Sequence, residues 1–378
     1  MKRGAVRIIS TAMCAAIMLM AVCASGCWDM EEINKRTYVL GIGVDKGDEE
    51  GEYVFTMQTA DSSPDAKGGV RCAVMQTATL AQALRRLDRA GAYDTTLVHL
   101  GCVVLGASVE GEDIAALLGY LFTSAQTRRQ CVVAAADDSA RELMEMKSDS
   151  STAMQIATML EKNDDALRQT SRLTLSSLKT ALDGRGCFVM HRVALMEQKE
   201  QEESSSDTVD ATAKLRISGA NVYSGGTFSG SMSEEETELA RLFLDGQTSG
   251  IIAVAREEGA QFHYKINKSS CRTVCSVVSG VPMYEITVEV DCSLADWQGA
   301  EGGGTKPDRP QEEEIAQSLC GQLEALAQRS VNELGAAPLG LDKEMRRQHW
   351  KWYEENSGSW AKLYKQAYIE LWVVCRTS

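Results

Sequence analysis

A stretch without a single apolar side chain divides this sequence into two parts. Between Glu197 and Asp207 every residue is Glu, Gln, Lys, Ser or Asp. Such a segment has nothing to bury and cannot contribute to a core. We therefore expect a linker at residues 197–211. It would separate an N-terminal region at 27–196, made of one or two subdomains, from a C-terminal domain at 212–378.

The N-terminus has the layout of a bacterial lipoprotein signal. Three basic residues lie among the first seven, an apolar stretch spans 8–22, and small residues at 24–26 lead to Cys27. This pattern predicts that residues 1–26 are removed and that a diacylglyceryl group is attached to the Cys27 sulfur. Two alternatives stay open. One is an uncleaved membrane anchor, although about 20 apolar residues are needed to cross a bilayer. The other is a plain secretory signal cut elsewhere.

The composition limits the classes of partner. The 378 residues include 53 acidic and 39 basic side chains, a formal net charge of −14. An acidic surface argues against nucleic acid as a partner. It also argues against binding to anionic lipid through basic patches. The acyl chains on Cys27 would therefore provide the attachment to the membrane.

Cysteine is frequent, but its positions do not suggest a metal site. Nine cysteines follow Cys27, and an odd number cannot all pair within the chain. Most lie in apolar runs, where a thiol behaves as a small hydrophobic group, so we expect buried free thiols. Disulfides stay open because an exported chain can form them. The one close pair, Cys271 and Cys275, has no second pair or nearby histidine to complete a zinc site. The nine residues are Cys72, Cys102, Cys131, Cys187, Cys271, Cys275, Cys292, Cys320 and Cys375.

Strand and helix patterns alternate irregularly along the chain. Because they do not form regular βαβ units, we expect an α+β fold with two to three small mixed domains, in which largely antiparallel sheets are flanked by helices. The clearest predicted elements are a hairpin of residues 38–45 and 53–59 with a solvated acidic tip from Asp45 to Glu50, a hairpin turn at Gly225-Gly226, a long amphipathic helix at 312–334 and a closing strand at 363–376.

No catalytic, cofactor or metal motif is present. The four histidines do not form an H-x-x-x-H pattern, and neither a G-x-S-x-G elbow nor a P-loop occurs. Gly41 and Gly43 follow a strand but lead into an acidic turn, whereas a dinucleotide site needs a helix N-terminus there. For the tryptophans at 350, 352 and 360, packing in a core or at a domain interface is favoured over a ligand cage. We therefore predict no enzymatic activity and no cofactor.

Several short motifs occur in a fixed order along the chain. They are Gly26-Cys27-Trp28-Asp29, Glu32-Ile33-Asn34, Gly41-Ile42-Gly43-Val44-Asp45-Lys46-Gly47, Arg128-Arg129, Gly219-Ala220-Asn221-Val222-Tyr223, Ser229-Gly230, Glu234-Glu235-Glu236-Thr237 and residues 349–360 with the final strand. Together they resemble the Ger(x)C family of spore germination lipoproteins, and they follow the family's order over nearly the whole mature chain. One departure is Pro338-Leu339-Gly340-Leu341-Asp342, where the family often has Asp-Ile-Phe-Gly-Phe-Gly.

The resemblance implies the C subunit of a nutrient germinant receptor, without enzymatic activity. Its partners would be two integral membrane subunits of the A and B types, and it would be lipid-anchored to the outer face of the cytoplasmic membrane, the spore inner membrane. Contact with the small-molecule germinant is left open. The N-terminal segment beside the anchor and the C-terminal helix and strand are candidate contact regions. Two other hypotheses stay open, an extracytoplasmic solute-binding lipoprotein and a surface hydrolase.

Overall fold

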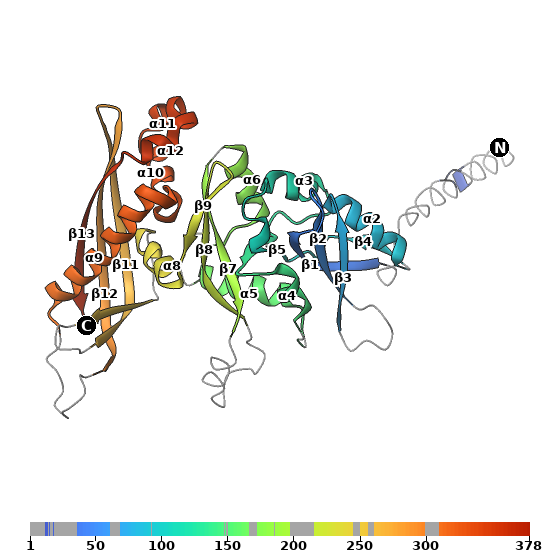
Figure 1. Ribbon diagram of the computed structural model, residues 1–378, viewed down its shortest axis with the longest axis horizontal. Helices are drawn as coiled ribbons and strands as arrows, with labels where there is room; N and C mark the ends of the chain where they lie inside the picture. Colours follow the sequence, from blue (N-terminus) through green and yellow to red (C-terminus); the bar gives the residue numbers. More distant parts are fainter. Residues whose placement is uncertain are drawn as a thin grey trace, which may run out of the picture.

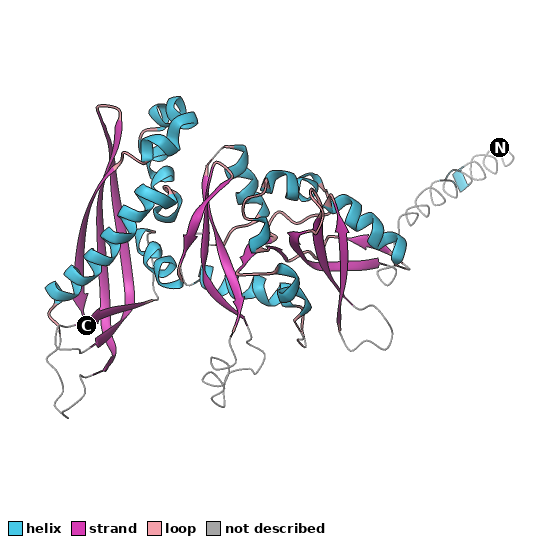
Figure 2. Cartoon of the chain, viewed as in Figure 1, coloured by secondary structure: helices cyan, strands magenta, loops and turns pink. Residues whose placement is uncertain are grey.

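The structure, a computed structural model, contains two β-sheets with helices packed on them (Figures 1 and 2). Cys27, all but four residues of the expected signal and the whole of the expected linker lie outside the described residues. The α+β class predicted from the sequence is confirmed. The structure describes residues 12, 13, 15, 18, 36–60, 69–91, 93–146, 148, 150–165, 172–184, 186–196, 215–244, 250–255, 261–298 and 310–378, without the side chains of 162–165 and 337.

The first sheet has nine strands in the order β3-β2-β1-β5-β6-β7-β8-β9, with β4 beside β1. The predicted N-terminal hairpin is confirmed, since β1 and β2 pair antiparallel with Val44 opposite Phe55. The strands are β1 (Arg36–Lys46), β2 (Tyr53–Ala60), β3 (Val70–Thr77), β4 (Asp94–Thr96), β5 (Cys102–Leu105), β6 (Val132–Ala136), β7 (Cys187–Leu195), β8 (Leu215–Ser224) and β9 (Thr227–Met232).

The centre of this sheet is parallel and its two sides are antiparallel. Strands β1, β5, β6 and β7 run parallel to one another. Helices cover both faces of the centre, which explains why β5 and β6 are continuous apolar runs. One face packs on α2 (Leu80–Ala90), α3 (Ile114–Thr123) and α6 (Leu175–Asp183), and the other on α4 (Ala140–Glu145) and α5 (Thr152–Asp165).

The sheet continues across the predicted linker. Strand β7 precedes the linker and β8 follows it, and the two pair antiparallel with Cys187 opposite Ser224. The next connection is the predicted hairpin turn, in which Gly225 and Gly226 have φ values of 59° and 87°. Glycine adopts such angles without steric cost, as a tight turn requires. The division of the chain at 197–211 stays a prediction.

The second sheet follows the first along the chain and has the order β10-β11-β12-β13. Helix α9 packs on one of its faces. The final strand pairs in parallel with β12, although a strand that closes a hairpin meander would be antiparallel. The elements are α8 (Glu234–Ala240), η4 (Arg241–Phe243), β10 (Ile251–Ala255), β11 (Gln261–Val278), β12 (Val281–Gln298), α9 (Glu312–Arg329), η5 (Ser330–Leu334), η6 (Ala337–Leu339), α10 (Leu341–Gln348), α11 (Trp350–Asn356), η7 (Ser357–Ser359), α12 (Trp360–Tyr364) and β13 (Tyr368–Thr377), with η3 (Ala107–Val109) in the first half.

The predicted long C-terminal helix is present, and the predicted closing strand starts later than expected. The long helix at 312–334 is confirmed as α9 followed by a π-helical turn. The start of the closing strand was predicted too early, because residues 360–364 are helical and the strand begins at Tyr368. Trp360 and Tyr364 lie four residues apart on one helix face and are both buried, which favours the helix.

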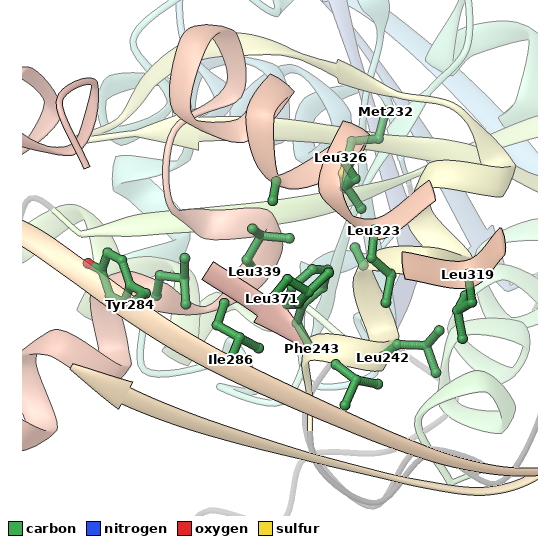
Figure 3. Close-up of a cluster of buried hydrophobic side chains, with 14 of the residues drawn as sticks. Met232, Leu242, Phe243, Tyr284, Ile286, Leu319, Leu323, Leu326, Leu339 and Leu371 are labelled. Atoms are coloured by element: carbon green, nitrogen blue, oxygen red, sulfur yellow. The ribbon is translucent and has the colours of Figure 1, made fainter. Parts of the chain in front are cut away.

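The C-terminal core is a single cluster of buried side chains from both sheets. Leu319, Leu323 and Leu326 of α9 belong to the same buried cluster as Tyr284 and Ile286 of β12 (Figure 3). The same cluster includes Met232 of β9 and the buried faces of β7 and β8. The second sheet therefore shares its core with the edge of the first.

Adding one methyl group at Gly41 should destabilise the fold. A Cβ atom built on Gly41 would lie 2.1 Å from the Cβ of Ala153, so α5 packs on β1 only because residue 41 has no side chain. Overpacking of this kind typically costs about 1–3 kcal/mol. We expect Gly41→Ala to lower the thermal unfolding midpoint measured by circular dichroism. Gly111→Ala, where a Cβ atom would meet nothing within 4 Å, is the matched control and should unfold like the wild type.

Candidate functional site

A cavity of about 590 Å³ lies where the first sheet meets the C-terminal helices. Its volume is in the range of small-molecule sites, roughly 300–1,000 Å³, which are common between packed units. Strand β7 and helix α6 form one side, and α8, η4 and the segment from η6 to α11 form the other. Much of the wall is apolar and includes Leu173, Phe188, Val189, Met232 and Leu244.

Asp342 is the buried carboxylate of this cavity. It lies in the first turn of α10, and only 5% of its surface is exposed. The backbone N–H groups of Lys343 and Cys187 lie close enough to the carboxylate to lower its pKa in part. Cys187 belongs to β7, so Asp342 of α10 faces the strand on the opposite side of the cavity. Burial nevertheless raises the pKa of Asp342, and its Oδ1 atom has no hydrogen-bond partner among the described residues.

Two other titratable groups of the wall are not prepared for catalysis. Burial raises the pKa of the Cys187 thiol to about 12, and its Sγ atom lies 3.4 Å from Ser224 Oγ. A thiol in this state is a poor nucleophile at neutral pH. Arg346, also in the wall, is 3.0 Å from Glu354 and thus already has a carboxylate partner. The described part of the wall therefore combines apolar side chains with one buried acid.

The glycine-rich motif at 41–45 has a structural role. The Asp45 carboxylate accepts hydrogen bonds from the backbone N–H groups of Ala140 at 2.9 Å and Arg141 at 2.8 Å, at the start of α4. Asp45 is therefore buried and caps a helix. Its placement at a solvated hairpin tip was wrong, because a contact 95 residues away in sequence decides it. The rest of the tip, from Asp48 to Glu50, is exposed as expected.

The motif at 219–223 lies in β8 and connects this strand to the turn that follows η3. Gly219 has a φ of 136°, and a Cβ atom there would lie 2.2 Å from the Met232 carbonyl oxygen. Asn221 is fully buried and donates to Glu110 Oε1 at 2.6 Å. A motif that sequence reasoning recognised only as a family pattern therefore explains a β-bulge and a long-range hydrogen bond.

The acidic start of α8 is held by α9. Arg329 contacts the carboxylate of Glu236, and its Nη2 atom donates to the Ser231 carbonyl oxygen at 2.9 Å. Glu236 also completes a capping box with Ser233. The motif at 234–237 therefore forms the N-terminal turn of α8, which Arg329 connects to α9.

The three tryptophans separate into two groups. Trp360 is buried, and its ring lies 4.8 Å from Tyr353 and 6.4 Å from Trp352. These contacts confirm the prediction of core packing for Trp352 and Trp360. The prediction is wrong for Trp350, which is 60% exposed.

Neither a metal-binding cluster nor a membrane-spanning helix is present among the described residues. They contain no group of three His, Cys, Asp or Glu side chains that could hold a metal ion. Within the same ranges, every helix is too short or too polar to cross a membrane. The expected lipid site, Cys27, lies outside the described residues and stays a prediction. The cavity was missed by sequence reasoning because its walls come from four separate segments.

Replacing Asp342 with asparagine should make stability less dependent on pH. Burial raises the pKa of Asp342 in the folded chain, so the folded state holds this proton more tightly than the unfolded chain does. The resulting stability is complete below the unfolded pKa, near 3.9, and is lost as the pH rises through the higher folded pKa. Thermal unfolding from about pH 4 upward should show a decline in the wild type that is smaller in Asp342→Asn.

The exposed turn residue Asp48 provides the control for this titration. Asp48→Asn should keep the wild-type slope of midpoint against pH, because this side chain lies in solvent. Equal slopes in the wild type and Asp342→Asn would contradict the role assigned to the buried carboxylate.

Comparison with known proteins gives a consistent family. The spore germination protein N-terminal domain matches residues 29–195, and the spore germination B3/GerAC-like C-terminal domain matches residues 218–375. Spore germination protein A3 of Bacillus subtilis is 24% identical over 292 residues, covering 74% of each chain. Spore germination protein B3 of the same organism is 19% identical over 370 residues, covering 92% of each.

A solved structure has the same fold. The crystal structure of the GerBC protein superposes with a TM-score of 0.56 at 13% identity, covering 92% of this chain and 99% of that one. The matched family consists of germinant-receptor C subunits, is associated with membranes in spores and is not enzymatic. A role in spore germination follows for this chain. With both domains matched in order, the chain belongs to the Ger(x)C family of spore germination proteins.

Proposed function

We propose that this chain is a lipid-anchored, non-enzymatic subunit of a nutrient germinant receptor, acting through contacts with integral membrane subunits of the A and B types. The observation that carries the proposal is the match to both family domains in order, which together span most of the chain.

The anchor is the diacylglyceryl group on Cys27, at the outer face of the spore inner membrane. Two acyl chains hold a protein stably in a bilayer, whereas one chain binds only marginally. The folded body is acidic and is therefore kept off anionic headgroups. In this arrangement the lipid determines where the protein is, and protein contacts determine what it does.

The C-terminal strand is the proposed contact surface for the partner subunits. Strand β13 is at the edge of its sheet, and its outward face carries three large apolar side chains. Tyr368 is 57% exposed and Trp372 is 44% exposed, and Val374 follows them on the same face. Exposed aromatic residues are enriched at protein interfaces, and an unpaired strand edge adds hydrogen-bonding groups.

The cavity that contains Asp342 supports a second candidate function, that of a solute-binding lipoprotein. Its volume and its buried Asp342 would suit a small polar ligand. Isothermal titration of the purified chain with amino acids separates the two candidates, because tight binding favours a solute-binding lipoprotein.

Removing the lipid site should release the protein from the membrane. We expect Cys27→Ala to move from the membrane pellet to the soluble fraction and to slow germination, because no acyl chains can be attached. Cys23→Ala, which changes a cysteine inside the expected signal, is the matched control and should stay in the pellet. If Cys27→Ala fractionated with the membrane and germinated normally, the anchor proposal would fail.

Polar substitutions on β13 should weaken the receptor assembly. Loss of two central aromatic contacts typically costs more than about 2 kcal/mol, or roughly a thirtyfold change in affinity. We expect the double variant Tyr368→Ser, Trp372→Ser to recover far less of the integral membrane subunits from gently solubilised spore membranes. Tyr120→Ser, at a residue of α3 that is equally exposed, should recover the wild-type amount.

Two results would count against this proposal. If the wild-type protein came down alone, the receptor-subunit function would lose its main support. If the wild type recovered its partners and the double variant recovered as many, the function would stand but the contact surface would be wrong.

A further inference from the structure

Two buried cysteines lie side by side in the second sheet. The Sγ atoms of Cys292 in β12 and Cys375 in β13 are 3.6 Å apart. The strands are parallel, with Val290 opposite Cys375, so Cys292 lies two residues further along on the same face. Both side chains are in the C-terminal core. This pair is 83 residues apart in sequence, and no spacing motif connects them.

The two thiols are chemically unequal. Either thiol can donate its S–H to the other sulfur, and with Cys375 as the donor this hydrogen bond lowers the pKa of Cys292 while raising that of Cys375. A thiolate is the form that attacks disulfides. Cys292 is therefore suited to be the attacking thiol and Cys375 the second one. By contrast, burial raises the pKa of Cys102 and Cys131, in the centre of the first sheet.

We propose that Cys292 and Cys375 form a reversible disulfide that ties the C-terminal strand β13 to β12. The oxidant is an exogenous disulfide, either a small molecule or a protein. The inference that this happens in the spore rests on the proposed location outside the cytoplasm, where disulfides persist. The chemistry itself depends only on the folded chain.

The reaction proceeds by two exchanges. The Cys292 thiolate attacks one sulfur of the exogenous disulfide, forms a mixed disulfide and expels one thiolate. Cys375 then loses its proton to solvent and attacks the Cys292 sulfur, which expels the second thiolate. In sum, two protein thiols and one external disulfide give one protein disulfide and two external thiols, so electrons and protons balance.

The position of the pair allows the required movement. A disulfide needs its sulfur atoms about 2.05 Å apart, so the strands must shift toward each other. Strand β13 is an edge strand of its sheet, and polar contacts close to Cys375 hold it in place. The Thr377 backbone N–H donates to Glu312 at 2.7 Å, and the Ser378 N–H donates to the Cys292 carbonyl oxygen at 3.0 Å. Local opening of these two hydrogen bonds would also admit the oxidant.

The disulfide would restrict a large part of the C-terminal region. It closes a loop that includes α9 and the helices that carry Asp342 and the tryptophans. Cross-links that close long loops limit the unfolded chain most. The same strand carries Tyr368 and Trp372, the proposed partner contacts, so oxidation would fix the strand that presents them.

The experiment uses the full-length chain, purified reduced in detergent and incubated with oxidised glutathione. We expect two protein thiols to be lost, a cross-linked peptide that joins Cys292 to Cys375 in mass spectrometry, and a higher thermal midpoint that dithiothreitol reverses. Cys72→Ser, Cys320→Ser is the matched control. It removes two of the more accessible thiols and should form the same cross-link.

Variants at the pair complete the test. Cys292→Ser should leave Cys375 reduced and abolish the rise in thermal midpoint. The proposal is overturned if the folded wild type keeps both thiols while Cys72 or Cys320 becomes glutathionylated, or if the cross-linked peptide joins other cysteines. Neither result would depend on where the protein resides or on its receptor partners, so failure here leaves the proposed function intact.

Discussion

Strands β7 and β8 connect the whole molecule because each buries both of its faces. Phe188 and Tyr223 stack on one face, with ring centroids 4.8 Å apart, inside the core of the first sheet. Their neighbours Cys187 and Val222 point to the other face, into the core beneath the second sheet. Side chains alternate across a strand, so one pair of strands serves two cores. A shift in their register would disturb both.

The cavity lies beside strand β7 of this β7–β8 pair. Asp342 lies across the cavity from Cys187, the first residue of β7. Helix α6 and strand β7 form one side of this cavity and α10 forms part of the other. The acid is tolerated in the core because backbone N–H groups satisfy part of it.

Local chemistry made the strands, turns and helix starts predictable, and long-range contacts made the rest unpredictable. The Gly225-Gly226 turn follows from the tolerance of glycine for positive φ. The helix at 312–334 follows from the helical spacing of its apolar residues. Both signals act over a few residues. Asp45 was misplaced because its partners are 95 and 96 residues away. The family motif was recognised correctly, but its physical reason, a helix packed on glycines, appears only in the structure. The cavity and the Cys292–Cys375 pair needed strand register as well, and β13 pairs in parallel with β12 against expectation.

The elements form a row in which β3 and β13 lie at opposite ends (Figure 1). An anchor that precedes β1 and a partner contact on β13 would therefore act at different ends of the row. Strands β7 and β8 contribute side chains to the cores on both sides, so they are one route by which a conformational change at one end would reach the other. The buried Asp342 lies in the cavity wall beside β7. A change in its protonation or in the filling of the cavity would therefore act where the C-terminal helices pack beside the first sheet.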